Sequence, residues 1–552
     1  MSSKLRIIPI GGCGEVGKNM TVIEYEDSII VIDAGIMFPH NDMLGVDSII
    51  PDWNYLKDKF ENVKALLITH GHEDHIGAIG YFMRNTDAPI YATPLTAGLI
   101  SAKLRDSKQS GKRLETMQAG DAFAVGPFLV EPFHMTHSIP DCVGFGITTP
   151  VGLIVHTGDY KFDHTPVDGW PPDFAKLSEF SARGVLCLLA DSTNSEVKGW
   201  TKSEQVVTRA MQDVFAEAKG RVIVASFASL ISRIWQVADA AHAHGRKLAI
   251  AGRSMREYVK IAQKLGYLDL PDDLLVDVGQ ANGMADDKVA IMATGSQGEP
   301  MSVLGRLARG RHHKLKIKEG DTVVISAHTI PGNEETINRI INMLLQKGAE
   351  VLYENNSMVH VSGHASQDEM KLLINLVRPK FIIPVHGELR QLKQHGKLAK
   401  QMGMKDENII VIENGTPVEL TEHEIDVQPR MKGGYIFVQG GSAGEIGFPQ
   451  IRNRERLARA GFFHASVRLD PNAVIIGKPK ITSEGFIDLK DENDLLDGVT
   501  EIIQDAATQY KADWKQLHSH IEGAVSRYLY SETKLRPQVY VVVHSARDLN
   551  VA

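Results

Sequence analysis

The sequence predicts an α/β protein of several domains, one of which interrupts another. Short apolar runs rich in Val, Ile and Leu alternate with amphipathic segments, as they do in folds that pack helices on a sheet. The alternation becomes more regular after residue 203, which indicates a second domain. The chain of 552 residues is also too long for one core, because single hydrophobic cores stop growing at roughly 300 residues.

The domain boundaries follow from these changes in pattern. We expect a first α/β domain over residues 1–203 that resumes over 366–432. A second α/β domain over 204–365 interrupts it, a linker follows over 433–450, and a small α+β domain covers 451–552.

The composition is that of a soluble globular protein, with 43% hydrophobic and 23% charged residues. No apolar run approaches the ~20 residues that a membrane span needs, and the N-terminus reaches a strand too soon for a signal peptide. Three cysteines, Cys13, Cys142 and Cys187, are too few for a disulfide framework, so we expect a cytoplasmic protein. The net charge of −8 means that a nucleic-acid partner would need a local basic groove.

The first motif along the chain is a glycine-rich turn after a strand expected over Leu5–Ile10. The segment Gly12–Gly17 reads G-x-G-x-x-G, the spacing of a dinucleotide-binding loop. That loop needs a helix directly after the glycines. Two strands are expected here instead, over Met20–Tyr25 and Ser28–Asp33, so we interpret the segment as a turn in a β-meander.

The densest group of metal-binding side chains follows the next buried strand. The apolar run Ala65–Ile68 ends at the segment Thr69–His75 (THGHEDH). Because α/β folds place their sites at the carboxyl ends of strands, we expect a functional site here. Imidazole and carboxylate together suit Zn²⁺ or a similar first-row divalent ion. The candidate ligands are His70, His72, Asp74 and His75, and their spacing allows one loop to serve two metals.

Later strands of the first domain end in further candidate ligands. The strands expected over Phe128–Phe133, Gly152–His156 and Val185–Ala190 lead to His137, Asp159 and Asp191. Ligands at separate strand ends can converge in space. His134 and His156 also flank strands, and we interpret both as packing or outer-shell residues.

The second domain shows the regular alternation of a parallel sheet. Ser203 is expected to cap a helix whose apolar face includes Val207, Met211 and Phe215. A buried strand over Phe381–Val385 then ends at His386, which indicates a return to the first domain. The strands expected in between cover 221–225, 247–251, 289–293, 322–327 and a stretch near 351, with a helix over 334–347.

The tail reads as a small α+β domain after a glycine-rich linker around 433–444. Strands are expected over Phe462–Val467, Val474–Ile476 and Val539–Val543. One long helix is expected between them, with an apolar stripe that we interpret as core or a subunit contact. The stripe comprises Leu495, Val499, Ile502, Ala506, Tyr510, Trp514, Leu517, Ile521, Val525 and Tyr528.

Together these motifs resemble the bacterial ribonuclease J family, nucleases of the metallo-β-lactamase fold that carry a β-CASP insertion. The resemblance runs from end to end. It implies a metallo-β-lactamase αββα sandwich interrupted by a β-CASP α/β domain, plus a small C-terminal α+β domain. The segments that carry it are Gly11–Met20, Thr69–Ile76, Met135–Asp141, His156–Asp163, Ala190–Asn194, Ala293–Pro300, His360–Ala365 and Pro384–Glu388.

The resemblance implies a centre with two metal ions, expected to be Zn²⁺ with Mn²⁺ as an alternative. Asp33 would orient ligand histidines from outside the first coordination shell. The ligands would be His70, His72 and His137 for one ion, Asp74, His75 and His386 for the other, and Asp159 for both.

The implied reaction is in-line hydrolysis of RNA that leaves a 3′-hydroxyl and a 5′-phosphate. The family acts as a 5′-to-3′ exonuclease with endonuclease activity in RNA maturation and decay. His364 would protonate the leaving oxygen while Asp191 holds its charged form, unless His364 contributes mainly to phosphate binding. A histidine at position 386 favours RNA over DNA, because DNA-repair relatives tend to have valine there.

Two small-residue turns resemble the family's pocket for the 5′-monophosphate of RNA. Each turn alone is a weak signal, and a helix cap is the alternative interpretation. A basic run over Arg306–Lys318 would line the RNA path or else form a solvated face. The pocket residues would be Ser226, Phe227 and Ala228, with His360, Val361, Ser362, Gly363, His364 and Ala365.

The expected partners are single-stranded RNA, further copies of the chain in a homodimer or homotetramer, and other RNA-decay proteins, with no membrane. Two rival functions remain open. A hydrolase of small thioesters or lactones shares the metal centre but has little use for the inserted domain. A non-catalytic RNA-binding scaffold would be expected to have lost some of the ligands.

Overall fold

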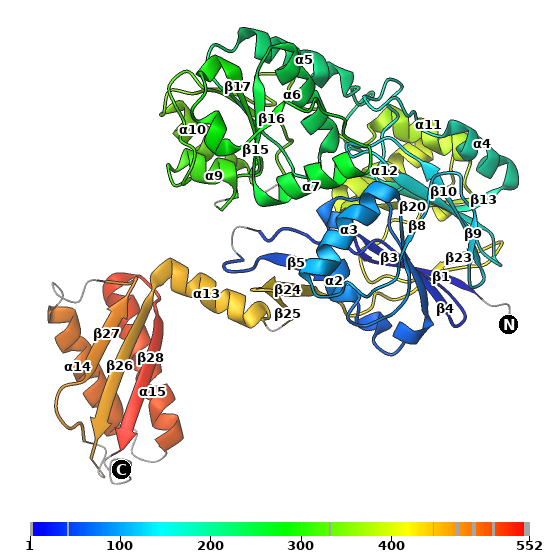
Figure 1. The fold of residues 1–552 in the computed structure, drawn as a ribbon. Coiled ribbons are helices and arrows are strands. Elements are labelled where there is room, and N and C mark those ends of the chain that lie inside the picture. The colour runs from blue at the N-terminus through cyan, green and yellow to red at the C-terminus, as the bar shows by residue number, and fades with distance from the viewer. Residues whose placement is uncertain are drawn as a thin grey trace. The chain divides into compact units, whose positions relative to one another are not determined.

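The structure, a computed structural model, describes residues 4–40, 43–299, 301–330, 333–444, 446–470, 474–487, 493–509 and 514–545. The chain divides into two compact units, whose positions relative to one another are not determined (Figure 1). The first unit comprises the described residues up to Phe38 and those of Ser48–Ile436. The second comprises the described residues of Pro39–Asp47 and those from Phe437 onward.

Two sheets form the centre of the first unit. The eight-stranded sheet has the order β23-β22-β1-β3-β4-β6-β7-β8 and the six-stranded sheet the order β20-β13-β12-β11-β10-β9. Their facing sides share one buried core, which contains Ile30 of β4 and Ile154 of β12. The first sheet comprises β1 (Leu5–Gly11), β3 (Met20–Tyr25), β4 (Ser28–Ile32), β6 (Val63–Leu67), β7 (Ile90–Ala92), β8 (Leu114–Thr116), β22 (Val418–Leu420) and β23 (Ile425–Val427). The second comprises β9 (Phe123–Val125), β10 (Phe128–His134), β11 (Val143–Thr148), β12 (Leu153–His156), β13 (Val185–Asp191) and β20 (Phe381–Val385).

Helices cover the outer faces of both sheets, so the predicted αββα sandwich is confirmed. Leu95 and Ile100 of α3 pack with Val31 on the outer face of the first sheet. Phe180 of α4 and Leu373 of α11 pack with Leu188 on that of the second. The helices are α1 (Glu73–Ile76), α2 (Ile79–Phe82), α3 (Pro94–Asp106), α4 (Phe174–Arg183), α11 (Gln367–Val377) and α12 (Leu389–Gln401).

The inserted domain is a parallel sheet in the order β16-β15-β17-β14-β18-β19, as its alternating pattern predicted. After it, β20 pairs in parallel with β13, so the chain does return to the first sandwich. The strands are β14 (Val222–Ala225), β15 (Lys247–Ala251), β16 (Leu275–Val276), β17 (Val289–Ala293), β18 (Thr322–Ile325) and β19 (Glu350–Leu352). The helices are α5 (Gln205–Glu217), α6 (Ile231–Ala243), α7 (Arg253–Lys264), α8 (Val278–Ala281), α9 (Val303–Ala308) and α10 (Glu334–Leu345).

The glycine-rich segment near the N-terminus is a turn, as predicted. Gly12, Gly14 and Gly17 have φ values of 83°, 90° and 104°, which favour glycine. The strands β3 and β4 follow in place of a helix, so a dinucleotide-binding loop is excluded. Within this segment β2 (Cys13–Gly14) pairs with β21 (Gly387–Glu388), which comes directly after His386. The strand β5 (Ser48–Pro51) lies later in the same domain.

The second unit contains a three-stranded sheet in the order β27-β26-β28. One face of this sheet packs against two helices, whose buried side chains include Val499 and Ile521. Its strands are β26 (Phe462–Leu469), β27 (Lys480–Glu484) and β28 (Gln538–Ser545), and its helices are α13 (Phe448–Ala460), α14 (Asn493–Gln509) and α15 (Trp514–Thr533). A hairpin of β24 (Tyr435–Gln439) and β25 (Ser442–Ala443) and the first residues of α13 lie within 433–450.

Two predictions in this unit are wrong. The single long helix is two helices, α14 and α15, that pack against one another, because a stripe at spacings of three and four does not reveal a chain reversal. The stripe residue Tyr510 lies outside the described residues. The strand expected over Val474–Ile476 is a single bridge between Leu469 and Ile475. Among the described residues, no helix is both long and apolar enough to cross a bilayer.

Candidate metal centre

The candidate ligands lie at one edge of the sandwich because the strands that lead to them run the same way. β10, β12, β13 and β20 share one direction, since β11 is antiparallel to both β10 and β12 and the other pairings are parallel. His137 follows β10, Asp159 follows β12, Asp191 ends β13, and His386 follows β20. The loop after β6 of the facing sheet brings in His70 to His75.

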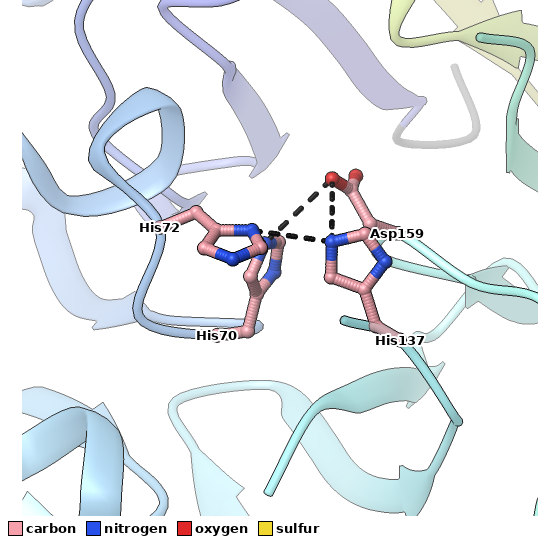
Figure 2. Close-up of side chains that lie close together, drawn as sticks. All are labelled: His70, His72, His137 and Asp159. Carbon is pink, nitrogen blue, oxygen red and sulfur yellow. Dashed lines mark hydrogen bonds and ion pairs between the residues drawn. The ribbon is translucent and has the colours of Figure 1, made fainter. Parts of the chain in front are cut away.

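The first group of donors combines three imidazoles and a carboxylate (Figure 2). Nδ1 of His72 lies 3.0 Å from Nε2 of His70 and 3.1 Å from Nε2 of His137. Oδ2 of Asp159 lies 3.6 Å from the same His70 nitrogen and 3.7 Å from that of His137. Four donor atoms therefore converge within 4.8 Å of one another.

A second group of donors uses the same Asp159 carboxylate. Nε2 of His75 lies 3.2 Å from Oδ2 of Asp159 and 3.5 Å from Oδ2 of Asp74. His386 places Nδ1 2.7 Å from Oδ1 of Asp159 and Nε2 3.4 Å from Oδ2 of Asp74. Because Asp159 belongs to both groups, the two groups are adjacent.

The chemistry of these groups fits divalent cations. Burial lowers the pKa of His70 and His137 well below the usual range and that of His72 to about 4, so all three rings offer neutral lone pairs. Neither ring nitrogen of buried His386 makes a hydrogen bond of acceptable geometry, despite the short contact with Asp159. Lone pairs that face one another at hydrogen-bond distance are typical of ligands around a shared cation.

Outer partners fix the tautomers of two of the donor histidines. Nδ1 of His75 lies 2.7 Å from Oδ2 of buried Asp33, and Asp33 also accepts hydrogen bonds from the backbone and hydroxyl of Thr69. Nδ1 of His137 lies 2.8 Å from the carbonyl oxygen of Gly363. In both cases Nε2 is left facing the donor group. Asp33 and His386 adopt φ values of 62° and 51°, a strained conformation that their neighbours enforce.

Asn19 is a site residue that the sequence did not reveal. Its backbone N–H donates to the carbonyl oxygen of Asp74 at 2.9 Å, and its side-chain amide donates to the same oxygen at 3.1 Å. The amide nitrogen also lies 3.0 Å from Nε2 of His75. Asn19 lies two residues after Gly17, the last glycine of the glycine-rich turn. That position is the one feature of the sequence that could have pointed to it as a site residue.

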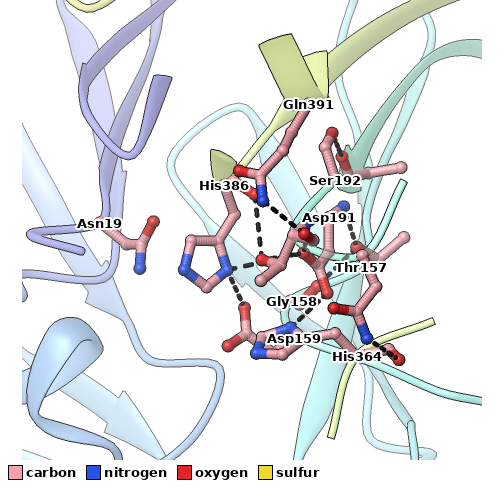
Figure 3. Close-up of polar contacts among 12 residues, drawn as sticks. Asn19, Thr157, Gly158, Asp159, Asp191, Ser192, His364, His386 and Gln391 are labelled. Atoms are coloured by element: carbon pink, nitrogen blue, oxygen red, sulfur yellow. Dashed lines mark hydrogen bonds and ion pairs between the residues drawn. The ribbon is translucent and has the colours of Figure 1, made fainter. Parts of the chain in front are cut away.

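His364 and Asp191 form a hydrogen-bonded pair beside the second group (Figure 3). Nδ1 of His364 lies 2.7 Å from Oδ2 of Asp191, which is fully buried. Burial lowers the pKa of His364, but the charge of Asp191 outweighs that effect and holds the pKa above its usual value. Backbone N–H and hydroxyl groups of Thr193 donate to the other oxygen of Asp191 and fix its orientation.

The two flanking histidines belong to neither group of donors. His134 stacks on Trp170 with ring centroids 3.8 Å apart, and its Nδ1 lies 2.9 Å from the carbonyl oxygen of Pro171. His156 accepts a hydrogen bond from the backbone of Gly158. Both rings therefore have packing and hydrogen-bonding partners outside the donor groups.

The structure places one of the two candidate phosphate-binding turns against the metal site. A Cβ on Gly363 would lie 2.6 Å from the ring of His137, and Ser362 accepts a hydrogen bond from the backbone of His364. The segment His360–Ala365 thus borders the donor groups. Ser226, Phe227 and Ala228 follow β14, and Ala228 packs against the same buried core as Val361. No hydrogen bond joins the two turns among the described residues.

The last residues of the basic run Arg306–Lys318 lie at the amino ends of strands in the inserted sheet. They precede β18, and the carbonyl oxygen of Lys316 accepts a hydrogen bond from Arg221, which precedes β14. The carboxyl ends of these strands lead to Ser226 and Ser326, and Ser326 donates to Val359 next to His360. The first residue of the run, Arg306, belongs to α9, whose Leu304 donates to the carbonyl oxygen of Thr294 just after β17. The topology therefore favours the solvated-face interpretation for the last residues of the run.

Four family models match the chain. The Metallo-beta-lactamase superfamily model matches residues 13–193, and the model for the Ribonuclease J beta-CASP domain matches 219–344. The Zn-dependent metallo-hydrolase RNA specificity domain matches 348–412, and the Ribonuclease J C-terminal domain matches 449–546.

Full-length relatives match from end to end. Ribonuclease J2 of Bacillus subtilis is 38% identical over 548 residues, which cover 98% of this chain and 99% of the relative. Ribonuclease J 1 of Streptococcus pyogenes is 39% identical with 98% coverage of both chains. Ribonuclease J of Synechocystis is 38% identical and covers 98% of this chain and 87% of its own.

A solved structure supports the fold alone. A protein of unknown function from Enterococcus faecalis matches 76% of this chain and 100% of its own, with a TM-score of 0.53 and 15% sequence identity.

Proposed function

Since the chain belongs to the ribonuclease J family and is a metal-dependent ribonuclease, we propose that it hydrolyses RNA with two divalent ions held around Asp159. The proposed mode is 5′-to-3′ exonuclease action together with endonuclease action, in RNA maturation and decay. The observation that carries the proposal is the position of the Asp159 carboxylate, which belongs to both groups of donors.

The proposed ligands follow the two groups. A pair of bound ions supplies an activated water and neutralises charge on the attacking and leaving oxygens of a phosphodiester. Zn²⁺ suits these ligands best, and Mn²⁺ is the alternative. His70, His72 and His137 would hold one ion, Asp74, His75 and His386 the other, and Asp159 would bridge them.

His364 is the proposed general acid. Its ring lies between those of His137 and His386, with centroids 5.0 Å and 5.4 Å away, so it borders both groups of donors. The charge of Asp191 raises the pKa of the ring and so favours its protonated form, and an imidazolium can donate a proton to the leaving 3′-oxygen. Asp33 acts one step further out by orienting His75.

A pocket for the 5′-monophosphate of single-stranded RNA is proposed at the two turns. The closeness of Gly363 to His137 supports the segment His360–Ala365, and Ser226, Phe227 and Ala228 would complete the pocket. A phosphate held there fixes how far the first phosphodiester lies from the donors, which favours release of one nucleotide at a time. We further propose a cytoplasmic homodimer or homotetramer that acts with other RNA-decay proteins.

One experiment tests both the reaction and the pocket. The purified protein is incubated with one RNA that carries either a 5′-monophosphate or a 5′-triphosphate, and mononucleotides are counted. We expect faster release from the monophosphate, and loss of all cleavage on His75→Ala. Cleavage of RNA by the His75→Ala variant would contradict the two-metal mechanism. Equal rates of mononucleotide release from the two RNAs would contradict the proposed pocket for the 5′-monophosphate.

A further inference from the structure

Two tyrosines of the inserted domain reach into the loops that carry the donor groups. They come from α7 and the turn after it, which pack against α3 of the sandwich. Gly98 of α3 permits the close approach, because a Cβ there would lie 2.7 Å from Ile261. An ion pair between Arg105 and Glu257 borders the same contact. The two domains are therefore in direct contact beside the candidate metal centre.

Tyr258 contacts the loop His70–His75, which supplies members of both donor groups. Its hydroxyl donates to Oε1 of Glu73 at 3.2 Å, and Lys103 of α3 binds both oxygens of that carboxylate. Glu73 lies between His72 and Asp74 and begins α1, which also carries His75. Tyr258 is 7% exposed, so the hydrogen bond lies at a covered interface. Because Glu73 is the first residue of α1, a contact that restrains its side chain also restrains the first turn of this helix.

Tyr267 contacts the loop of the first donor group. Its hydroxyl donates to Oδ2 of Asp141 at 2.8 Å, and the same oxygen accepts the backbone N–H of Leu95 at the start of α3. Asp141 is 4% exposed, has a φ of 67°, and closes the segment that begins at His137. The next residues tie this segment to the other loop, because the backbone N–H of Val143 donates to the carbonyl oxygen of Thr69.

Both tyrosine hydroxyls keep the proton that their hydrogen bonds need. Burial and the facing carboxylate raise the pKa of both tyrosines, so each hydroxyl remains a donor at neutral pH. Hydrogen bonds to carboxylates are stronger than those between neutral groups, and the 2.8 Å bond of Tyr267 is shorter than the 3.2 Å bond of Tyr258. The inserted domain thus makes one part-buried hydrogen bond to each of two loops that carry donors, the loop after β6 and the loop after β10.

We propose that Tyr258 and Tyr267 are positioning residues through which docking of the inserted domain sets the geometry of two of the donor-bearing loops, those after β6 and β10. The inference rests on the proposed function, because it takes His70 to His75 and His137 as ligand loops. It goes beyond that function by giving the inserted domain a role in retaining the ions, separate from any contact with RNA. Among the described residues, neither hydroxyl hydrogen-bonds a donor residue, so both tyrosines act through Glu73 and Asp141.

The test uses Tyr258→Phe, Tyr267→Phe and the double variant in the full-length protein. Phenylalanine keeps the ring packing and removes only the hydroxyl. Metal retained per protein is measured against increasing chelator, and kcat and KM are measured on 5′-monophosphorylated RNA. We expect each single variant to lose its ions at a chelator concentration about tenfold lower than the wild type does. A tenfold loss of metal affinity is the lower end of the range measured when outer-shell partners are mutated. We expect kcat to fall with KM little changed, and the double variant to lose more than either.

Tyr540→Phe is the matched control, because Tyr540 is 45% exposed in the second unit. It should behave as the wild type in every measurement. A lower melting temperature with wild-type metal retention and kcat would show a merely structural role and overturn the proposal, as would variants that match the wild type throughout. Failure of the proposed function is a separate result: the wild type would bind metal and leave RNA intact, and metal retention would still decide the role of the tyrosines.

Discussion

Asp159 occupies the position on which the candidate centre depends. Each of its oxygens faces different imidazoles, and its side chain is almost fully buried. A buried carboxylate is costly unless compensating charge surrounds it. Burial raises the pKa of Asp159, but the charges of His386 and His75 outweigh that effect and hold it well below its usual range, a role that bound cations would take over. One side chain therefore links two groups of donors, each of which draws residues from both sheets of the sandwich.

His364 gives a pH prediction at the scale of a single residue. Its pKa is raised by Asp191, so the protonated acid persists to higher pH than a free histidine, and activity falls as pH rises through that pKa. Asp191→Asn removes the raising charge, so the fall in activity should move to lower pH. Loss of general acid catalysis in His364→Gln should cost about 10²–10⁴ in kcat. The measurement is the pH profile of kcat for the wild type and both variants.

Metal content serves as the control for these variants, since neither His364 nor Asp191 is a proposed ligand, and it should equal that of the wild type. If the fall in kcat at high pH occurs at the same pH in Asp191→Asn as in the wild type, Asp191 does not set the pKa of the general acid.

At the scale of elements, the loop after β4 depends on a glycine where it passes α1. A Cβ on Gly35 would lie 1.6 Å from the carbonyl oxygen of Asp74, and the backbone of Gly35 donates to Asn19. The loop Gly11–Asn19, the start of α1 and the end of β4 are therefore packed backbone against backbone. This packing leaves no room for Asp74 to move independently of Asn19.

Gly35→Ala should displace α1 and with it two candidate ligands. We expect a loss of about 1–3 kcal/mol in the free energy of unfolding, the usual cost of overpacking, together with weaker metal binding. Denaturant unfolding and metal analysis measure the two effects. Gly111→Ala is the matched control, because a Cβ there meets nothing within 4 Å. If Gly35→Ala keeps wild-type metal content, the loop is not positioned by this contact.

The strands that carry the ligands could be predicted because buried strands read as apolar runs and their polar ends stand out. His137, Asp159 and His386 each follow such a run. Asn19 could not be predicted, because its role depends on a backbone contact with Asp74 that has no sequence pattern. The reversal between α14 and α15 was missed for a similar reason, since both helices continue one apolar periodicity. The contacts of Tyr258 and Tyr267 arise from domain docking, which local sequence does not encode.

At the scale of the whole molecule, the two units should respond differently to metal removal. All donor residues lie in the first unit, so a bound ion stabilises that unit alone. An ion at 100 times its dissociation constant adds about 2.7 kcal/mol to the stability of the state that binds it. Calorimetry with and without chelator should show one transition that moves to lower temperature and one that does not. A common shift of both transitions would show that the units unfold together.

The chain order of the ligands bears on how such an enzyme is synthesised. His386 joins the centre only after the inserted domain, hundreds of residues beyond His70, and β20 must pair beside β13 to place it. A growing polypeptide on the ribosome therefore lacks one member of the second group of donors until most of its length has emerged. With the proposed ligand set, the protein would be unable to cut the message that encodes it until translation is nearly finished.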